Sequence, residues 1–264
     1  MAVLDDLLED LAAESGALDA VLAPLDAAAW RTPTPAPGWT VAHQIAHLAW
    51  TDRVAALAAR DPDGFNAMLT RALQEDGVTF VDKEAERGAQ LEPADLLAAW
   101  RADRAELAAA LAEVPAGGKL PWFGPPMGAA TMATARLMET WAHGQDVVDA
   151  LGVKREPTAR LKNVAHLGVR TRDFAFIQRG LQPPAAEFRI ELTAPDGGLW
   201  TWGPETAQER VSGPALDFCL LVAQRRHRDD LGVRVVGSQA DQWLDIAQVF
   251  AGPSGPGRSK GQFA

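Results

Sequence analysis

Four residues of this chain have the types and the spacing of a metal site. His43 and His47 stand four residues apart, just after residues 37–40, which read Pro-Gly-Trp-Thr. On a helix this spacing places both imidazoles on one face, one turn apart. Glu139 and His143 repeat the spacing much later in the chain, so they too are expected to share a helix face.

Helical bundles build metal sites from inward-facing histidine and carboxylate side chains on different helices. His47, Glu139 and His143 offer two imidazoles and one carboxylate. This is the donor set of a catalytic zinc site with an open fourth position, and it also suits other divalent metals. A Glu-x-x-x-His pair is common on helix surfaces, but here its neighbours are apolar, and a buried charge needs a strong partner. The residues therefore leave two interpretations open, a metal site or a hydrogen-bonded network in the core.

Three further side chains lie near this set in the sequence. His43 is a candidate second-shell group, substrate contact or proton shuttle, because histidine titrates near neutral pH; a purely structural role at the helix start is the alternative. Asp146, three residues after His143, is a candidate to hydrogen-bond near the site. Asp52 lies about 140° round the helix from His47 and is expected to be a solvated or capping acid.

The remaining candidates fall in the second half of the chain. Arg225 and Arg226 belong to a basic cluster at the expected end of a helix, where cations complement the helix dipole. His227 lies in the same cluster, and His166 is expected to be structural. The single cysteine, Cys219, sits in an apolar run and is expected to be buried rather than nucleophilic.

The elements that must position these residues are helical in the first part of the chain. Apolar residues recur every three or four positions, as in amphipathic helices, and turn residues separate the segments. The predicted helices cover residues 3–29, 41–60, 94–113, 129–150 and 160–179, with a less regular helical stretch over 65–90. Thr40 is the expected N-cap of the histidine helix.

The pattern changes near residue 186. Residues 188–193 alternate apolar and polar side chains and are followed by the turn 195–198 and a second strand over 199–202, which predicts a β-hairpin. Further strands are expected over 209–212 and 232–236, and helices over 213–226 and 239–250. The sequence therefore predicts an α+β protein with a helical bundle over 1–183, a small α+β domain over 184–252 and a flexible tail over 253–264.

Composition limits the classes of function. The chain has 264 residues, with 25 Lys and Arg against 35 Asp and Glu, and a formal net charge of −10. This charge disfavours nucleic acid and anionic membranes as partners. One cysteine excludes an internal disulfide, and neither a signal peptide nor a long apolar run is apparent. A cytoplasmic protein acting on small molecules is expected, with homo-oligomerisation left open.

The motif and the order of domains together resemble a known family. Residues 37–40 (Pro-Gly-Trp-Thr), residues 45–48 (Ile-Ala-His-Leu) and the later Glu139-x-x-x-His143 are similar to the mycothiol-dependent maleylpyruvate isomerases, members of the DinB-like metal-binding four-helix bundles. The resemblance spans nearly the whole chain and implies a bundle followed by a sterol-carrier-protein-like domain. It also implies a divalent metal, usually zinc, held by His47, Glu139 and His143. His43 departs from that ligand set.

The resemblance has further consequences for function. The nucleophile in that family is the thiolate of mycothiol, and an arginine of the C-terminal domain reaches toward the bundle site; Arg225 or Arg226 matches it by position. The leading hypothesis is a metal-dependent enzyme that uses such a thiol to isomerise or conjugate a small electrophile. The alternatives are a hydrolase that uses metal-bound water and a non-enzymatic protein that binds a metal or a small ligand, because fold alone does not decide function.

Overall fold

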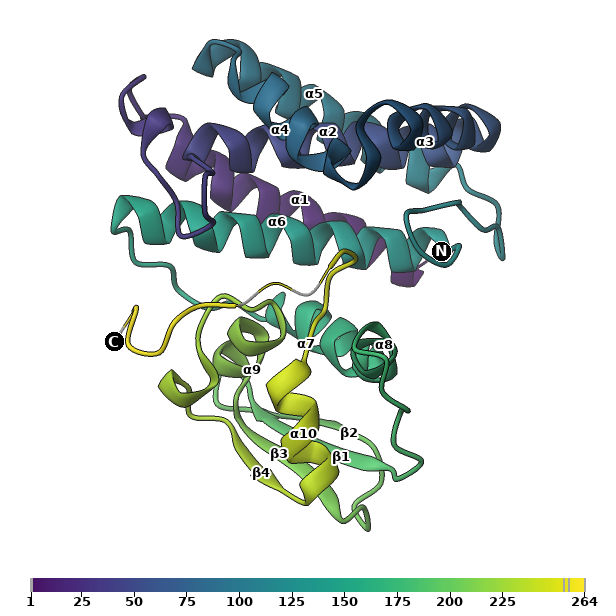
Figure 1. The fold of residues 1–264 in the computed structure, drawn as a ribbon, viewed down its shortest axis with the longest axis vertical. Helices are drawn as coiled ribbons and strands as arrows, with labels where there is room; N and C mark the ends of the chain where they lie inside the picture. The colour runs from purple at the N-terminus through teal and green to yellow at the C-terminus, as the bar shows by residue number, and fades with distance from the viewer. Residues whose placement is uncertain (1, 254, 256, 264) are drawn as a thin grey trace. The chain divides into compact units, whose positions relative to one another are not determined.

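Four long helices form the frame of the first half of the chain. They are α1 (Ala2–Leu22), α2 (Val41–Arg60), α5 (Pro93–Ala112) and α6 (Ala129–Leu151). In this computed structural model, which describes residues 2–253, 255 and 257–263, α2 packs against α5 and α6, and α1 packs against α6 (Figure 1). The predicted bundle is confirmed.

The boundaries of these helices follow local chemistry. Thr40 precedes α2 as its N-cap, and Gly152 ends α6 with a left-handed φ of 64°, which glycine adopts without steric cost. The first helix ends at Leu22 and not near residue 29, because Pro24 cannot donate the next backbone hydrogen bond. Asp26 then accepts a hydrogen bond from the Ala29 amide at 2.8 Å and starts a short 3-10 helix, η1 (Ala29–Arg31).

The irregular stretch after α2 contains two helices. They are α3 (Pro62–Asp76) and α4 (Phe80–Ala89), joined by the 3-10 turn η2 (Gly77–Thr79). α4 lies against α2, and an added Cβ at Gly88 would come within 2.7 Å of Ala46 Cβ. A residue without a side chain is therefore required for this packing.

The core around α2 is apolar and nearly fully buried. Its members larger than alanine come from α1, η1, α2, α5 and α6: Leu18, Leu22, Trp30, Val41, Ile45, Leu48, Leu96, Leu97, Trp100 and Val147. The N-terminal turn of α2 is thus held by packing from several sides, which gives a rigid support for the side chains that it carries.

The second half of the chain contains a four-stranded sheet in the order β2-β1-β3-β4. The strands are β1 (Phe188–Thr193), β2 (Leu199–Trp202), β3 (Glu209–Pro214) and β4 (Arg234–Val236). β1 pairs antiparallel with β2 and parallel with β3, while β3 pairs antiparallel with β4. The predicted hairpin turn is present, with Gly197 at a φ of 85°.

Helices accompany this sheet on the same half of the chain. They are α7 (Leu161–Arg170), α8 (Arg172–Gln178), α9 (Ala215–Val222) and α10 (Ser238–Ile246), together with the 3-10 turn η3 (Arg228–Asp230). The helix predicted to reach residue 226 stops at Val222, because Gln224 has a left-handed φ of 56° and the Arg225 amide donates back to Leu220 O at 2.8 Å. This is a Schellman-type helix end.

The chain divides into two compact units, residues 1–155 and 156–264. The second unit includes α7 and α8, which the sequence assigns to the bundle. α7 packs on α9 at Gly168, where an added Cβ would lie 2.9 Å from Val222. An α+β protein with a helical first part and a small sheet is therefore confirmed, with the units dividing earlier than residue 183.

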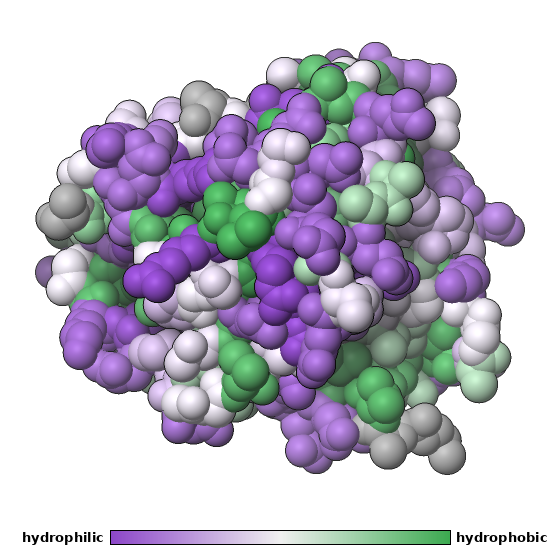
Figure 2. Space-filling model, turned by 90° about the horizontal axis from the view of Figure 1, so that it is seen from below, coloured by the Kyte–Doolittle hydropathy of each residue, from purple (hydrophilic) through white to green (hydrophobic). Residues whose placement is uncertain are grey.

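The surface agrees with the composition. The face in Figure 2 is largely hydrophilic, and its hydrophobic residues are scattered among hydrophilic ones. Within the described residues, no helix has both the length and the apolar character needed to cross a membrane. Part of the predicted tail, residues 254, 256 and 264, lies outside the described residues.

Candidate metal centre

The start of α2 is fixed by the loop that precedes it. Pro33 and Thr40 form an isolated antiparallel bridge, and Gly38 turns the loop with a φ of 78°. The Thr34 amide donates to Trp39 O at 2.7 Å, and the Val41 amide donates to Thr32 O at 3.1 Å. These bonds hold the loop 32–40 closed and place the Trp39 side chain beside the first turns of α2.

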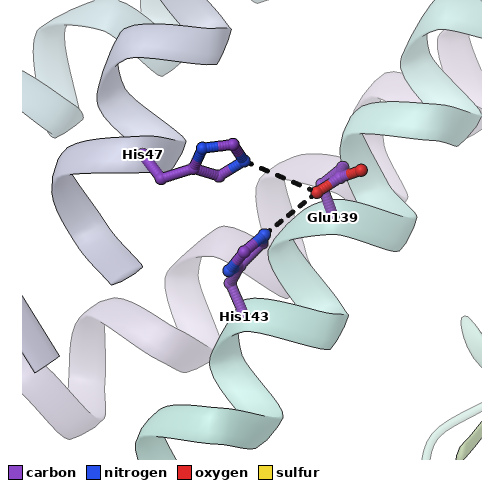
Figure 3. A group of neighbouring side chains, drawn as sticks. All are labelled: His47, Glu139 and His143. Carbon is purple, nitrogen blue, oxygen red and sulfur yellow. Dashed lines mark hydrogen bonds and ion pairs between the residues drawn. The ribbon is translucent and has the colours of Figure 1, made fainter. Parts of the chain in front are cut away.

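His47 on α2 and the pair Glu139 and His143 on α6 converge, as Figure 3 shows. One ligand atom from each residue lies within 4.8 Å of the other two. Oε2 of Glu139 is 3.0 Å from Nε2 of His143 and 3.7 Å from Nε2 of His47. The three side chains are between 11% and 19% exposed, so the group is shielded from bulk water but not sealed.

Opposing effects act on the Glu139 carboxyl. Burial raises its pKa, but hydrogen bonds and positive charge from His143 and His47 outweigh burial and hold the pKa well below its usual range. A buried carboxylate is therefore kept ionised by the two imidazoles beside it. An ionised carboxylate and two imidazoles are suited to hold a divalent cation.

Trp39 contacts all three histidines of this region. Its ring centroid is 5.4 Å from that of His47, 5.9 Å from that of His143 and 6.3 Å from that of His43. The His143 contact is stacked, with an interplanar angle of 21°. The indole therefore forms a wall that restricts both imidazoles of the group and keeps water from one side of it.

His43 occupies a position different from that of His47. Its Nδ1 accepts a hydrogen bond from the Thr40 amide at 3.2 Å and lies 2.8 Å from Thr40 Oγ1. Because a backbone amide only donates, Nδ1 is the acceptor, and the neutral ring carries its proton on Nε2, which donates to Glu86 on α4 at 2.8 Å. His43 thus caps α2 and ties it to α4, and it lies outside the group of three.

The two acidic residues near the site are both buried. Asp146, at 1% exposure, lies one turn beyond His143 on α6. The expectation that Asp52 is a solvated or capping acid is wrong: it is 2% exposed and accepts a hydrogen bond from Arg136 on α6 at 2.8 Å. Burial raises the pKa of Asp52 and the Arg136 guanidinium opposes this rise, so the pair is a structural link between α2 and α6.

The candidates of the second unit are described within that unit. Arg225 and Arg226 follow the end of α9, and each donates to a nearby backbone carbonyl at 2.7 Å, to Ala223 and Arg225 respectively. The Arg226 guanidinium also lies 3.9 Å from the centroid of the Phe263 ring. Both arginines are partly exposed and follow a helix that ends at Val222, earlier than the predicted end at residue 226.

Three other residues of this unit have structural roles. Cys219 is fully buried, and burial raises the pKa of its thiol, which fits the prediction of an unreactive core cysteine. Nδ1 of His166 accepts from the Trp202 indole at 3.2 Å. Nδ1 of His227 accepts from the Asp229 amide at 3.1 Å and caps η3.

The sequence does not single out Gln44, a fully buried residue that the structure places beside His143. It precedes His47 by three residues, so both lie on one helix face. That spacing was the available signal, but a glutamine in an apolar helix has no recognisable motif. Trp39 belongs to the quoted motif, and its contact with three imidazoles becomes visible only when α2 and α6 meet.

Family models match both parts of the chain. The family model described as mycothiol maleylpyruvate isomerase N-terminal domain matches residues 11–148, more than half of the chain. A second model, described as wyosine base formation, matches residues 184–234 within the second unit.

Similar proteins cover nearly the whole chain. The uncharacterized proteins Rv0036c and MT0041 of Mycobacterium tuberculosis, from strains ATCC 25618 / H37Rv and CDC 1551 / Oshkosh, are each 58% identical over 249 residues, 94% of this chain and 96% of theirs.

Two solved structures share the fold. They are the mycothiol-dependent maleylpyruvate isomerase, with a TM-score of 0.61 at 19% identity, and a histidine-to-alanine mutant of it, with 0.60 at 18%. Each covers 88% of this chain and 92% of the solved one. The match of the N-terminal domain model across the bundle decides the family: this chain belongs to the mycothiol maleylpyruvate isomerase family.

Proposed function

We propose that this protein is a metal-dependent enzyme that uses a low-molecular-weight thiol, such as mycothiol, to isomerise or conjugate a small electrophilic substrate. The observation that carries the proposal is the convergence of His47, Glu139 and His143 within 4.8 Å. Membership of the family supports a thiol as cosubstrate. Two imidazoles, a carboxylate and an open position favour zinc as the metal.

The side chains fit a divalent cation. Tetrahedral bonds of about 2.0–2.2 Å place neighbouring ligand atoms roughly 3.3–3.6 Å apart. The distances from Glu139 Oε2 to the two imidazole nitrogens, 3.0 and 3.7 Å, are close to this spacing. Glu139 is kept ionised in a largely buried position, and a positive charge among the three groups lowers the cost of that burial.

Within this proposal the protein orients the reactants and excludes water. A divalent metal in this site supplies a Lewis acid that favours the thiolate form of a coordinating thiol near neutral pH. Trp39 packs against both imidazoles and limits their rotation. His43 supports the first turn of α2 through Thr40 and Glu86. Asp146, which is buried one turn after His143, is proposed to hydrogen-bond near the site.

The nucleophile is expected to come from outside the chain. The only cysteine is buried, and its thiol has a raised pKa, so it is unsuited to attack an electrophile. A small thiol that enters the open position supplies the missing group. Arg225 or Arg226 is proposed to bind a carboxylate of the substrate or of the thiol, for which a planar guanidinium is well shaped.

Metal content tests the ligand assignment. We expect purified wild-type protein to hold about one divalent metal per chain by elemental analysis. His47→Ala, Glu139→Ala and His143→Ala should each lose most of it, because two remaining ligands bind weakly. His227→Ala is the matched control, because His227 caps η3 in the second unit. A His47→Ala variant that keeps full metal content would refute the assignment.

Thiol dependence tests the reaction class. Metal-loaded protein is assayed against a panel of small electrophiles with and without mycothiol, and turnover should require the thiol. Equal turnover without thiol would point instead to hydrolysis by metal-bound water. Metal binding with no turnover on any substrate would point to a binding protein. Arg225→Gln and Arg226→Gln are compared one at a time. The variant that lacks the carboxylate-binding arginine should have a raised KM for the carboxylate-bearing reactant.

A further inference from the structure

Gln44 joins the loop before α2 to a histidine of α6. Its side chain is fully buried, so neither end of the amide reaches bulk water. Nε2 lies 2.9 Å from Thr34 Oγ1, and Oε1 lies 2.5 Å from Nδ1 of His143. Because buried polar atoms need partners, these two contacts determine how the amide is oriented.

The direction of each hydrogen bond in this series, from Trp39 through Thr34 and Gln44 to His143, follows from the acceptor at its start, the Trp39 carbonyl. Trp39 O can only accept, and it receives the Thr34 hydroxyl proton at 2.9 Å. The hydroxyl has one proton, so its oxygen is left to accept from Gln44 Nε2. Oε1 of Gln44 then faces His143, and since an amide oxygen can only accept, the proton of that contact belongs to Nδ1 of His143.

This assignment fixes the state of the other ring nitrogen. A neutral imidazole with its proton on Nδ1 presents a lone pair at Nε2. Nε2 of His143 lies 3.0 Å from Glu139 Oε2, which also presents a lone pair. Two acceptors at this distance repel each other unless a cation lies between them. The arrangement therefore suits a cation between the two atoms.

We infer that Gln44 is a positioning residue of the metal centre, which holds the proton of His143 on Nδ1 and so presents Nε2 as a ligand. The inference rests on the proposed function in one respect, that the ligand is offered to a metal. Hydrogen bonds of this kind from a ligating histidine to an acceptor fix the tautomer and orient the ring. Thr34 acts one step further out by orienting the amide.

Within the described residues, His47 has no counterpart of Gln44. Nδ1 of His47 is buried and has no hydrogen-bond partner within the described residues. Its ring is positioned by packing against Trp39, at 5.4 Å between centroids, and against His143, at 4.5 Å. The two imidazoles are thus oriented by different means, and of the two only that of His143 has a hydrogen-bond contact with the Gln44 amide.

Metal affinity measured by chelator competition on the full chain gives the first test. Gln44→Leu should weaken the affinity about 10- to 100-fold, the usual effect of removing such a partner. Gln44→Glu keeps an acceptor oxygen for Nδ1 and should restore most of the affinity. Gln248→Leu is the control, because it also removes a buried glutamine, 2% exposed, from the second unit. Wild-type affinity in Gln44→Leu would overturn the inference.

Nitrogen NMR of the His143 ring gives a readout that a general loss of stability would not move. The wild-type signals, assigned by their absence in His143→Asn, should show Nδ1 protonated and Nε2 unprotonated in metal-loaded protein. A protonated Nε2 with a bare Nδ1 would overturn the inference. If wild-type protein binds no metal, the proposed function fails, yet Nδ1 should still be protonated, and a bare Nδ1 would then overturn the inference separately.

Discussion

At the scale of single residues, the two histidines one turn apart on α2 do different work. His47 points toward Glu139, whereas His43 accepts from the Thr40 amide and donates to Glu86. The ring of each histidine on α2 and α6 is therefore oriented by a different contact: the helix start for His43, packing for His47 and a side-chain amide for His143. Equal spacing along a helix does not give equal chemistry.

Loss of the His43 ring should affect stability before it affects metal binding. His43→Ala removes the acceptor for the Thr40 amide and the link to Glu86, so we expect a loss of about 1–2 kcal/mol in unfolding free energy. Denaturant unfolding measures this loss, and elemental analysis should find the metal content unchanged. Glu86→Ala, which removes only the exposed partner, should cost less. Metal loss from a stably folded His43→Ala would place His43 nearer the metal than this arrangement implies.

At the scale of elements, the bundle is held by contacts that link particular helix pairs. Asp19 on α1 accepts from Arg101 and Arg104 on α5, with shortest distances of 2.6 Å to each. The hydrogen bond from Arg101 lowers the pKa of the Asp19 carboxyl by more than its partial burial raises it. The carboxylate form is thus favoured in the folded state.

This shift makes part of the stability depend on acid pH. Because the folded pKa lies below the unfolded one, the contribution is complete above the unfolded pKa of Asp and is lost as the pH falls through the folded pKa. Asp19→Asn should therefore lower stability at neutral pH by on the order of 1 kcal/mol and flatten the acid limb of the stability profile. Asp6→Asn, on the exposed face of α1, is the control and should leave the profile unchanged.

The contact between α4 and α2 depends on a glycine. An added Cβ at Gly88 would lie 2.7 Å from Ala46 Cβ, and neither group can rotate away. Gly88→Ala should thus destabilise the first unit by about 1–3 kcal/mol, the usual effect of overpacking, despite the better helix propensity of alanine. Gly16→Ala in α1 meets nothing within 4 Å and should instead stabilise by up to about 1 kcal/mol. Thermal unfolding of the pair compares the two effects, and a stabilised Gly88→Ala would show that α4 can shift.

At the scale of the whole molecule, the chain consists of two compact units. The first contains its own apolar core and all three residues of the candidate metal centre. The second contains the sheet, Cys219 and the two arginines proposed to bind a carboxylate. The residues proposed to bind a metal and those proposed to bind a carboxylate therefore lie in different units.

This division predicts separable binding properties. A fragment of residues 1–155 should fold and hold about one metal per chain, because its core and ligands are internal. It should lack the carboxylate contact, so its affinity for the carboxylate-bearing reactant should be weaker than that of the full chain. Circular dichroism, elemental analysis and calorimetry measure the three properties. A folded fragment that binds no metal would show that the second unit completes the site.

The sequence predicts local features well where one residue determines them. Thr40 precedes α2 as a hydrogen-bonding N-cap. Gly152 at the end of α6 and Gly197 in the hairpin turn have a positive φ that favours glycine. The meeting of His47 with Glu139 and His143 is expected from the family resemblance and not from spacing alone, because the spacing on α2 pairs His47 with His43, which lies outside the group.

Long-range partners are the part that the sequence does not predict. Asp52 looks like a surface acid until Arg136, 84 residues later, is found beside it. Gln44 meets His143 across a separation of 99 residues, and no periodicity marks such a contact. The assignment of α7 to the wrong part of the chain has the same reason. Its amphipathic pattern shows that one face is buried, but not against which unit that face packs.

The candidate ligands are divided unequally between two helices, with a neighbouring pair on α6 and a single residue on α2 (Figure 3). A cation bound by both helices would close a loop of roughly ninety residues and, like a disulfide of that span, would destabilise the unfolded chain by about 4–5 kcal/mol. The same ion would then act as a reversible crosslink. Its removal by a chelator would lower the stability of the bundle as well as stop the proposed reaction. With one buried cysteine, the chain can form no internal disulfide. A bound metal would then constrain the unfolded chain in the way that disulfides constrain secreted domains.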